Sequence, residues 1–277
     1  MAGKLKSRDR NEIKPFLKWA GGKRWLIAKH PELFRQKFTS YSEPFLGSGA
    51  IFFHLQPKKS ILADLNEELV QTYSAIKDDW ARVLKHLMAH QLKHTSEYYY
   101  KIRQQRTRNE YTSAARLIYL NRTCWNGLYR VNLKGEFNVP IGTKSQVVSE
   151  DDCYEKIAAI LKNTTLLNCD FEVVIDKAGD GDFLFVDPPY TVRHNFNGFI
   201  KYNEHLFAWE DQIRLHDSLV RASKRGAKFL MTNAFHDSVR SLYNKDFKMF
   251  SAERASVISG TNAGRGIYEE LLIHNCV

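Results

Sequence analysis

The stretch YSEPFLGSGAIFFHL, residues 41–55, carries the first clear indication of the fold. A short β-type run leads into a glycine-rich turn, and the turn leads into an apolar run with helical spacing. A second β-type run, SILAD at residues 60–64, follows shortly after. Alternation of strands and helices along a chain is typical of a mostly parallel sheet whose faces are covered by helices.

Five later stretches have the same β-type character, and several are apolar throughout, as expected of strands that are covered on both faces. They are TTLLNCD (residues 164–170), DFLFVD (182–187), AKFLMTN (227–233), FKMFSAE (247–253) and YEELLIHN (268–275). Together with the first two runs, they predict an α/β fold with a doubly wound, Rossmann-like sheet.

The segment between SILAD and TTLLNCD is different, because helical spacing replaces the β-type runs. Apolar residues recur every three or four positions from Leu69 to Leu87, and residues 96–106 and 113–122 also have helical patterns. Residues 122–144 contain Asn-Gly and Lys-Gly-Glu turns between short β-type pieces, which predict a hairpin. A helical insertion therefore interrupts the sheet.

Length and charge narrow the class of protein. The chain has 277 residues, 43% of them hydrophobic, which is enough for one sizeable core with a smaller inserted domain. Its 41 Lys and Arg residues against 31 Asp and Glu give a formal net charge of +10. Because a basic protein attracts polyanions, nucleic acid is the leading class of partner. The alternative is that the excess of Lys and Arg belongs to a solvated surface without a function.

Cysteine and histidine usage indicates neither disulfides nor a metal site. The four cysteines are widely spaced and form no Cys-x-x-Cys pair, as expected of reduced thiols in a cytoplasm. His86, His90 and His94 have helical spacing without a metal-ligand pattern, and we expect them on a solvated helix face. Since no apolar run reaches the length of a signal peptide or membrane span, we expect neither secretion nor insertion.

Glycines and acids at the ends of predicted strands indicate a nucleoside site. Gly47 and Gly49 follow the first strand, where a tight turn lets a ligand approach the backbone closely. Asp64 lies 17 positions after Gly47, near the separation at which an acid binds ribose hydroxyls in nucleotide-binding sheets. Phe52 replaces the third glycine of a dinucleotide site, which favours a nucleoside without a pyrophosphate. For the glycines alone, a tight turn without a ligand is the alternative.

S-adenosylmethionine fits these features, because it joins an adenosine to a methionine end that carries both charges. Lys23, in FLKWAGGK at residues 16–23, is a candidate partner for its carboxylate. Asp170 and Phe171 follow another predicted strand, and they offer a hydrogen-bond acceptor and a flat apolar face for the adenine ring.

The run DFLFVDPPY, residues 182–190, places an acid, two prolines and a tyrosine directly after a buried strand. Ligands of such sheets bind beyond the carboxyl ends of the strands, and the prolines hold a rigid turn whose carbonyls face outward beside Asp187. An exocyclic amine that donates to these acceptors becomes a better nucleophile toward a sulfonium methyl, while Tyr190 stacks on the ring. A plain turn that closes a strand is the alternative for the tetrapeptide by itself.

FLKWAGGK, EPFLGSGAIFF, NGLYRVNLKGEFNVP and DPPY occur in this order along the chain. In combination they resemble the α-group of DNA adenine-N6 methyltransferases, particularly Dam-type enzymes, over nearly the whole chain. The resemblance implies a catalytic domain of residues 1–68 and 150–277 that binds S-adenosylmethionine, and an inserted target-recognition domain of residues 69–149 that binds double-stranded DNA. We also expect a monomer, without a metal, in the cytoplasm of a bacterial cell or a phage-infected host.

The resemblance implies three groups of site residues. The catalytic residues are Asp187, Pro188, Pro189 and Tyr190. The contacts to S-adenosylmethionine are Trp19, Ala20, Lys23, Pro44, Phe45, Gly47, Gly49, Asp64, Asp170, Phe171 and Asp187. The contacts to DNA are Lys18, Trp125, Asn126, Leu128, Arg130, Asn132, Pro140 and Lys144.

Three of these expectations concern individual roles. The resemblance implies that Arg130 reads the first guanine of a GATC site and that Trp125 fills the gap left in the base stack by a flipped adenine. Residues Phe199, Tyr202 and Phe207 are expected in a loop over the active site.

Alternatives stay open at this point. Lys144 stands near where Dam-type enzymes can place a tyrosine, and a relative that reads a longer site containing GAT would share most of this segment. A structural-RNA methyltransferase has the same acceptor turn, but A-form RNA hides its major groove from a hairpin of this kind. A DNA-binding relative without activity is the third possibility, against which the intact DPPY turn and Lys23 argue. A solitary enzyme, a restriction–modification enzyme and a phage product all fit the sequence.

Overall fold

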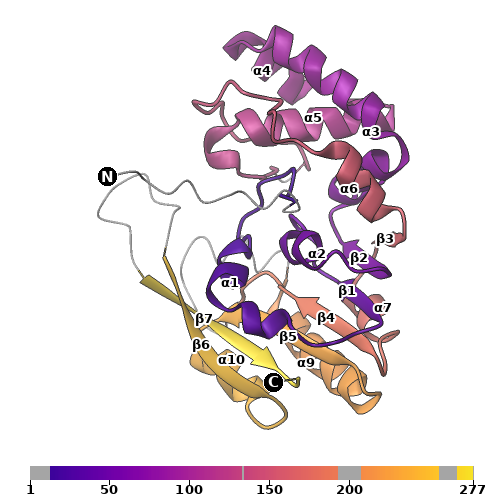
Figure 1. Cartoon of the computed structure of the whole chain (residues 1–277). Helices are drawn as coiled ribbons and strands as arrows, with labels where there is room; N and C mark the ends of the chain where they lie inside the picture. The colour runs from indigo at the N-terminus through magenta and orange to yellow at the C-terminus, as the bar shows by residue number, and fades with distance from the viewer. Residues whose placement is uncertain (1–12, 133, 193–206, 256–266, 277) are drawn as a thin grey trace, which may run out of the picture. The chain divides into compact units, whose positions relative to one another are not determined.

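The computed structural model describes residues 13–132, 134–192, 207–255 and 267–276, and its main element is a seven-stranded sheet (Figure 1). The strands lie in the order β3-β2-β1-β4-β5-β7-β6. The first five are parallel to one another, whereas β7 is antiparallel to both β5 and β6. The predicted α/β fold with a mostly parallel sheet is therefore confirmed.

All seven predicted strands are present, and their ends lie within two residues of the predicted ends. They are β1 Ser40–Glu43, β2 Ser60–Asp64, β3 Thr164–Asn168, β4 Asp182–Val186, β5 Lys228–Ala234, β6 Lys248–Ala255 and β7 Ile267–His274. Apolar runs bounded by polar turn residues are a strong signal, which explains why the sequence located these strands so closely.

The chain forms two compact units. The sheet unit comprises Arg24–Gly47, Pro57–Ser74 and Asn163–Val277, and the helical unit comprises Met1–Lys23, Ser48–Gln56 and Ala75–Lys162. Residues 13–23 and the helix after the glycine turn thus belong to the helical unit, although they precede the predicted insertion. The assignment of residues 69–149 to target recognition concerns function and stays a prediction.

Helices complete both units. Those of the sheet unit are α1 Arg24–Lys29, η1 Pro31–Phe34, α7 Phe171–Ile175, α9 Trp209–Lys224 and α10 Asp237–Tyr243. Those of the helical unit are α2 Ala50–Leu55, α4 Ser96–Gln104, α5 Glu110–Thr123, η2 Trp125–Gly127 and α6 Tyr154–Leu161, while α3 Glu67–Lys93 begins in the sheet unit and continues in the helical unit. In the described part of the chain, no helix combines the length and the apolar composition that a membrane span needs.

Alternate residues of β4 pack on opposite faces of the sheet. Leu184 and Val186 join an apolar cluster with side chains of α7, α9 and α10. Phe183 and Phe185 point to the other face, where the ring of Phe183 lies 6.0 Å from that of Tyr41 in β1. Because β4 is buried on both faces, its sequence is a continuous apolar run rather than an alternating one.

The three predicted helices of the insertion are present as α3, α4 and α5. Helix α3 is broken at Asp79, whose backbone has φ −144° and ψ 78°, and the Asp79 carboxylate restarts the helix by accepting from the backbone N–H of Arg82. The side chains of Thr95 and Asn109 cap α4 and α5 in the same way. Residues with short polar side chains thus begin each of these helical segments.

The expectation that the α3 histidines lie on a solvated face is wrong for His90 and His94. The ring of His90 stacks on that of Tyr119 at 4.8 Å and forms a hydrogen bond with Tyr98, and His94 forms one with the Tyr119 hydroxyl. Burial lowers the pKa of His90 to about 4. The tyrosines of α4 and α5 therefore partly cover a helix face whose sequence looks fully solvated.

Candidate active site and nucleic-acid interface

The order of strands in the sheet reverses between β1 and β4, which are parallel neighbours. Ligands of open α/β sheets bind outside the carboxyl ends of the strands at such a switch point. Pro44 and Phe45 follow the carboxyl end of β1, and Asp187 follows that of β4. The sheet unit therefore brings two of the predicted motifs together at one edge.

The acceptor turn at residues 187–190 is anchored by two side chains from the antiparallel half of the sheet. Thr232 of β5 donates a hydrogen bond of 2.6 Å to Oδ1 of Asp187. The hydroxyl of Tyr190 donates one of 2.7 Å to Oε2 of Glu270 in β7. Burial and the nearby carboxylates raise the pKa of Tyr190 well above its ordinary value, so its hydroxyl remains a donor.

Asp64 fixes the glycine-rich turn that follows β1. Its Oδ2 accepts from the backbone N–H of Gly47 at 3.1 Å, and its Oδ1 accepts from that of Asn66 at 2.9 Å. Burial raises the pKa of Asp64, and these two backbone donors oppose that shift. Gly47 has φ 48°, a left-handed conformation that favours glycine. Gly47 and Asp64, which are 17 positions apart in the sequence, are thus in direct contact.

Asp170 and Phe171 lie where β3 leads into α7. Asp170 caps the helix by accepting from the backbone N–H of Glu172, and it also accepts from Arg214 of α9 at 2.9 Å. The Phe171 side chain is only 2% exposed, and its ring stacks on that of Phe45 at 5.4 Å. Since Phe45 is half-buried, it offers more ring surface to a ligand than Phe171 does.

The loop expected over the active site is described only at its end. Phe199 and Tyr202 lie outside the described residues. Phe207 is 3% exposed, and its ring lies 5.7 Å from Phe45 and 5.8 Å from Phe171. Phe207 therefore supports the aromatic group that borders the carboxyl end of β1.

The segment FLKWAGGK lies in the helical unit, where Lys23 is buried and 3% exposed. The Lys23 ammonium donates a hydrogen bond of 2.6 Å to the carbonyl of Gly21, which has φ 81°. A buried ammonium needs such acceptors, because its desolvation is costly. The ring of Trp19 stacks on that of Tyr129 at 4.9 Å, whereas Ala20 is exposed.

Asn121 ties this segment to the turn that carries the predicted DNA contacts. It is fully buried, accepts from the backbone N–H of Lys18 at 2.9 Å and donates to the Lys18 carbonyl at 2.9 Å. The same amide donates to the carbonyl of Gly127 at 3.2 Å. The predicted cofactor segment and the predicted readout turn are therefore joined within one unit.

The turn Trp125–Gly127 exposes the aromatic ring predicted to contact DNA. Asn126 and Gly127 both have left-handed backbones, with φ 57° and 66°. Trp125 is 45% exposed, and its backbone N–H donates to the carbonyl of Pro140. Leu128 follows the turn and is half-buried.

The predicted hairpin has two antiparallel bridges, Cys124 with Ile141 and Val131 with Phe137, rather than regular strands. Asn132 closes its tip, because its side-chain oxygen accepts from the backbone N–H groups of Lys134 and Glu136. This turn chemistry is the local reason for the hairpin.

Two cationic side chains predicted to contact DNA have informative neighbours. Arg130 is exposed, and its Nε donates to the side-chain oxygen of Asn138 at 2.8 Å, which orients the guanidinium. Lys18 lies close to Lys144, and burial followed by that like charge lowers the pKa of Lys18. Two neighbouring cations are stabilised when an anion binds beside them.

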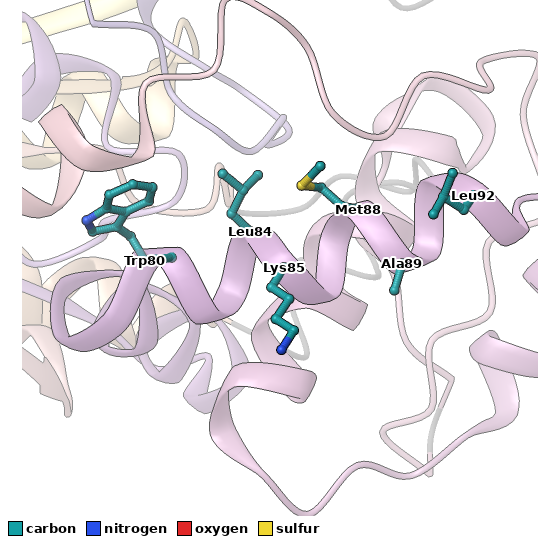
Figure 2. A pocket seen from close by; sticks show the side chains of 7 residues that line it. Trp80, Leu84, Lys85, Met88, Ala89 and Leu92 are labelled. Atoms are coloured by element: carbon teal, nitrogen blue, oxygen red, sulfur yellow. The ribbon is translucent and has the colours of Figure 1, made fainter.

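An apolar hollow of about 460 Å³ lies elsewhere in the helical unit, along one side of α3. Figure 2 shows Trp80, Leu84, Met88 and Leu92 in a row on that side, and Leu92 is 88% exposed. None of the residues that line it is a predicted site residue.

Several residues that position the site were not singled out from the sequence. They are Thr232, Glu270 and Arg254 in the sheet unit, and Asn121 and Asn138 in the helical unit. For Thr232, the polar pair Thr-Asn at the end of the apolar run AKFLMTN is a usable signal in the sequence. The asparagines carried no local signal, because their partners are fixed by the tertiary fold.

The sheet topology and the strand-end acceptor turn fit a methyltransferase, and comparison with known proteins specifies the class. The sequence matches the D12 class N6 adenine-specific DNA methyltransferases over residues 19–258. It is 34% identical to the type II methyltransferase M1.LlaDCHI of Lactococcus lactis subsp. cremoris, with 98% of each chain covered. It is 36% identical to the type II methyltransferase M.MjaIII of Methanocaldococcus jannaschii, with 95% of this chain and 99% of the relative covered.

A third relative is the DNA adenine methylase of Escherichia coli K12, which is 30% identical with 93% of each chain covered. The chain belongs to the D12 class of N6 adenine-specific DNA methyltransferases. It is therefore an enzyme whose substrate is DNA, and the structural-RNA alternative is not favoured.

Proposed function

We propose that this enzyme transfers a methyl group from S-adenosylmethionine to N6 of an adenine that is flipped out of duplex DNA, within the site GATC. The main support for the proposal is the pair of turns that follow the carboxyl ends of β1 and β4, where the strand order of the sheet reverses. There, Asp187 is anchored by Thr232, and the glycine turn after β1 is anchored by Asp64. Both features suit a nucleoside cosubstrate and an amine nucleophile beside it.

The acceptor turn activates the target amine. Asp187 and the outward carbonyl of Pro188 accept the two hydrogens of the adenine N6 group, which draws its lone pair out of conjugation with the ring. The half-buried ring of Tyr190 stacks on the flipped base. S-adenosylmethionine supplies an electrophilic methyl group on a sulfonium, and no covalent bond to the protein is needed.

In each unit, we propose a set of side chains as contacts to S-adenosylmethionine. In the sheet unit, Asp64 accepts the ribose hydroxyls, since each of its carboxylate oxygens has a second acceptor site beyond the backbone donor already bound. Asp170 and the rings of Phe45 and Phe171 face the adenine, next to Pro44 and Gly47. In the helical unit, the cosubstrate contacts are Trp19, Ala20, Lys23 and Gly49.

The helical unit is proposed to read the duplex. Arg130, oriented by Asn138, donates two hydrogen bonds to O6 and N7 of the first guanine. Trp125 enters the gap that the flipped adenine leaves, and its 45% exposure makes the ring accessible for that role. The remaining contacts are assigned to Lys18, Asn126, Leu128, Asn132, Pro140 and Lys144.

The net charge of +10 supports the same proposal, because a basic enzyme binds duplex DNA in a salt-dependent manner. The names of the relatives, type II methyltransferases and DNA adenine methylases, support site-specific modification of DNA. We extend that role to this chain, as a monomer that acts either alone or in a restriction–modification system.

A labelled-methyl transfer assay tests the proposal. Equal amounts of GATC duplex, GATT duplex and structured RNA are incubated with enzyme and S-adenosylmethionine at low and moderate salt. We expect transfer to the GATC duplex alone, confined to adenine and weaker at moderate salt. Equal transfer to GATT would contradict the site, and transfer to the RNA would contradict the substrate.

A further inference from the structure

Glu270 is a buried carboxylate that bridges the predicted catalytic tyrosine to a cation. It lies in β7 and is 4% exposed. Its Oε2 accepts from the Tyr190 hydroxyl at 2.7 Å, and its Oε1 accepts from Nη1 of Arg254 in β6 at 2.7 Å. All three residues belong to the sheet unit.

The antiparallel half of the sheet explains why a long acid fits inside at this position. Glu270 pairs with Ala234 of β5 on one side and with Ala252 of β6 on the other. Directly opposed side chains in a sheet lie about 5 Å apart, so two alanines leave room for the longer side chain of Glu270. The neighbouring Glu269 is exposed, because successive residues of a strand point to opposite faces.

A buried glutamate is costly unless its charge is compensated and its oxygens are hydrogen-bonded. Arg254 supplies the opposite charge, and its side chain is 20% exposed. The Tyr190 hydroxyl supplies a second donor, and its raised pKa keeps it protonated. A phenol ring held at its hydroxyl cannot swing freely about the Cα–Cβ bond, so the direction of its long axis is fixed.

We propose that Glu270, compensated by Arg254, is a positioning residue that fixes the direction of the Tyr190 side chain and so holds its ring in place for stacking on the target base. This inference rests on the proposed function, because it assumes that Tyr190 stacks on the methylated adenine. In this role Glu270 acts through the Tyr190 hydroxyl, which it binds, and not by a contact of its own with the base.

A double-mutant cycle separates positioning from a general structural role. We compare Glu270→Gln, Tyr190→Phe and the double variant, with Glu269→Gln as the matched control on the exposed face of the same strand. Steady-state methyl transfer gives kcat and KM, and thermal unfolding reports whether each variant is folded. Wild-type transfer to DNA adenine is measured first, so failure of the proposed function is seen separately.

We expect Glu270→Gln to lower kcat about tenfold, which is the effect of one hydrogen bond to a charged group. The KM values for both substrates should stay within about twofold, and Glu269→Gln should behave as wild type. In the Tyr190→Phe background, Glu270→Gln should add little further loss, because the hydroxyl through which it acts is already absent.

Losses that multiply in the double variant, or an unchanged kcat in Glu270→Gln, would overturn the inference. If Glu270→Gln shows no cooperative unfolding, Arg254→Gln takes its place in the same cycle, because Arg254 is partly exposed and lies in the edge strand β6. Arg254→Gln should likewise lower kcat in the wild-type background and add little further loss in the Tyr190→Phe background. Losses that multiply, or an unchanged kcat, would again overturn the inference.

Discussion

The sheet unit and the helical unit hold their predicted functional side chains in different ways. In the sheet unit, Asp187 is bound by Thr232, a fully buried residue of β5, which lies between β4 and β7 in the interior of the sheet. In the helical unit, Arg130 is bound by Asn138 on an irregular hairpin, and the arginine is exposed. A rigid, buried anchor suits chemistry that tolerates little displacement, whereas an exposed anchor leaves a side chain able to adjust to DNA.

The largest effect on turnover is expected in the sheet unit, from Asp187→Ala. Removing the acceptor of the target amine should lower kcat by about 10²–10³-fold, as for other preorganised groups at a reacting centre. Duplex affinity, measured by gel shift, should remain close to wild type. Asp180→Ala is the control, because Asp180 is exposed and precedes the opposite end of β4. A variant that retains most of its turnover would remove Asp187 from the mechanism.

The largest effect on stability is expected in the helical unit, from Asp152→Asn. Asp152 forms a two-point ion pair with Arg122, which also donates to the carbonyls of Phe16 and Val147. Both side chains are about 15% exposed, so breaking the pair leaves a largely buried cation and should cost about 3 kcal/mol of unfolding free energy. Chemical denaturation measures it, and Asp151→Asn is the exposed control. Equal midpoints for the two variants would show that the pair contributes nothing.

Gly142→Ala should disturb the hairpin while sparing the sheet unit. A Cβ at position 142 would lie 2.5 Å from the carbonyl oxygen of Cys124, and backbone atoms cannot yield as a flexible side chain can. We expect the free energy of unfolding to fall by about 1–3 kcal/mol and duplex binding to weaken, because overpacking of this kind displaces the adjoining turn. Gly179→Ala in the sheet unit is the control, because a Cβ there would meet no atom closer than 3.6 Å. Gly135→Ala, in the same hairpin, does not serve as a control. A Cβ there would meet no neighbour, but the left-handed backbone of Gly135, with φ 74°, would strain any other residue.

A smaller, pH-dependent effect is expected from His90. Its pKa in the folded protein, about 4, lies below the ordinary value of 6.5, so the unfolded chain binds more protons between these values. The stability that neutral His90 contributes is present above about pH 6.5 and is lost as the pH falls toward 4. His90→Phe should therefore flatten the dependence of the unfolding midpoint on pH from 7.5 to 5. An unchanged slope would contradict this assignment.

The strands of the sheet unit and the residues at their ends are the features that the sequence predicts best. The strands of the sheet unit were predicted within two residues, because apolar runs such as DFLFV require burial on both faces. The spacing of Gly47 and Asp64 predicted a shared site, and the two residues are directly hydrogen-bonded. The sequence pattern and the tertiary structure therefore agree for the strands themselves and for the side chains that lie directly at their ends.

Sequence reasoning was weaker where partners come from distant strands or from irregular backbone. Tyr190 and Glu270 are 80 positions apart, and only the antiparallel placement of β7 brings them together. The environment of His90 depends on tyrosines from α4 and α5, so its polar neighbours in sequence predicted the wrong surroundings. Tertiary contacts of this kind leave no periodic signal along the chain.

If the helical unit reads bases while the sheet unit performs the transfer, Arg130→Ala should change sequence preference. Binding and methyl transfer are measured on GATC duplex and on a duplex whose first guanine is replaced, at two salt concentrations. Base readout predicts a loss of about 1–3 kcal/mol on GATC duplex and little loss on the replaced duplex. Equal losses on both duplexes, with the salt slope reduced by about one, would show a phosphate contact and contradict base readout by Arg130.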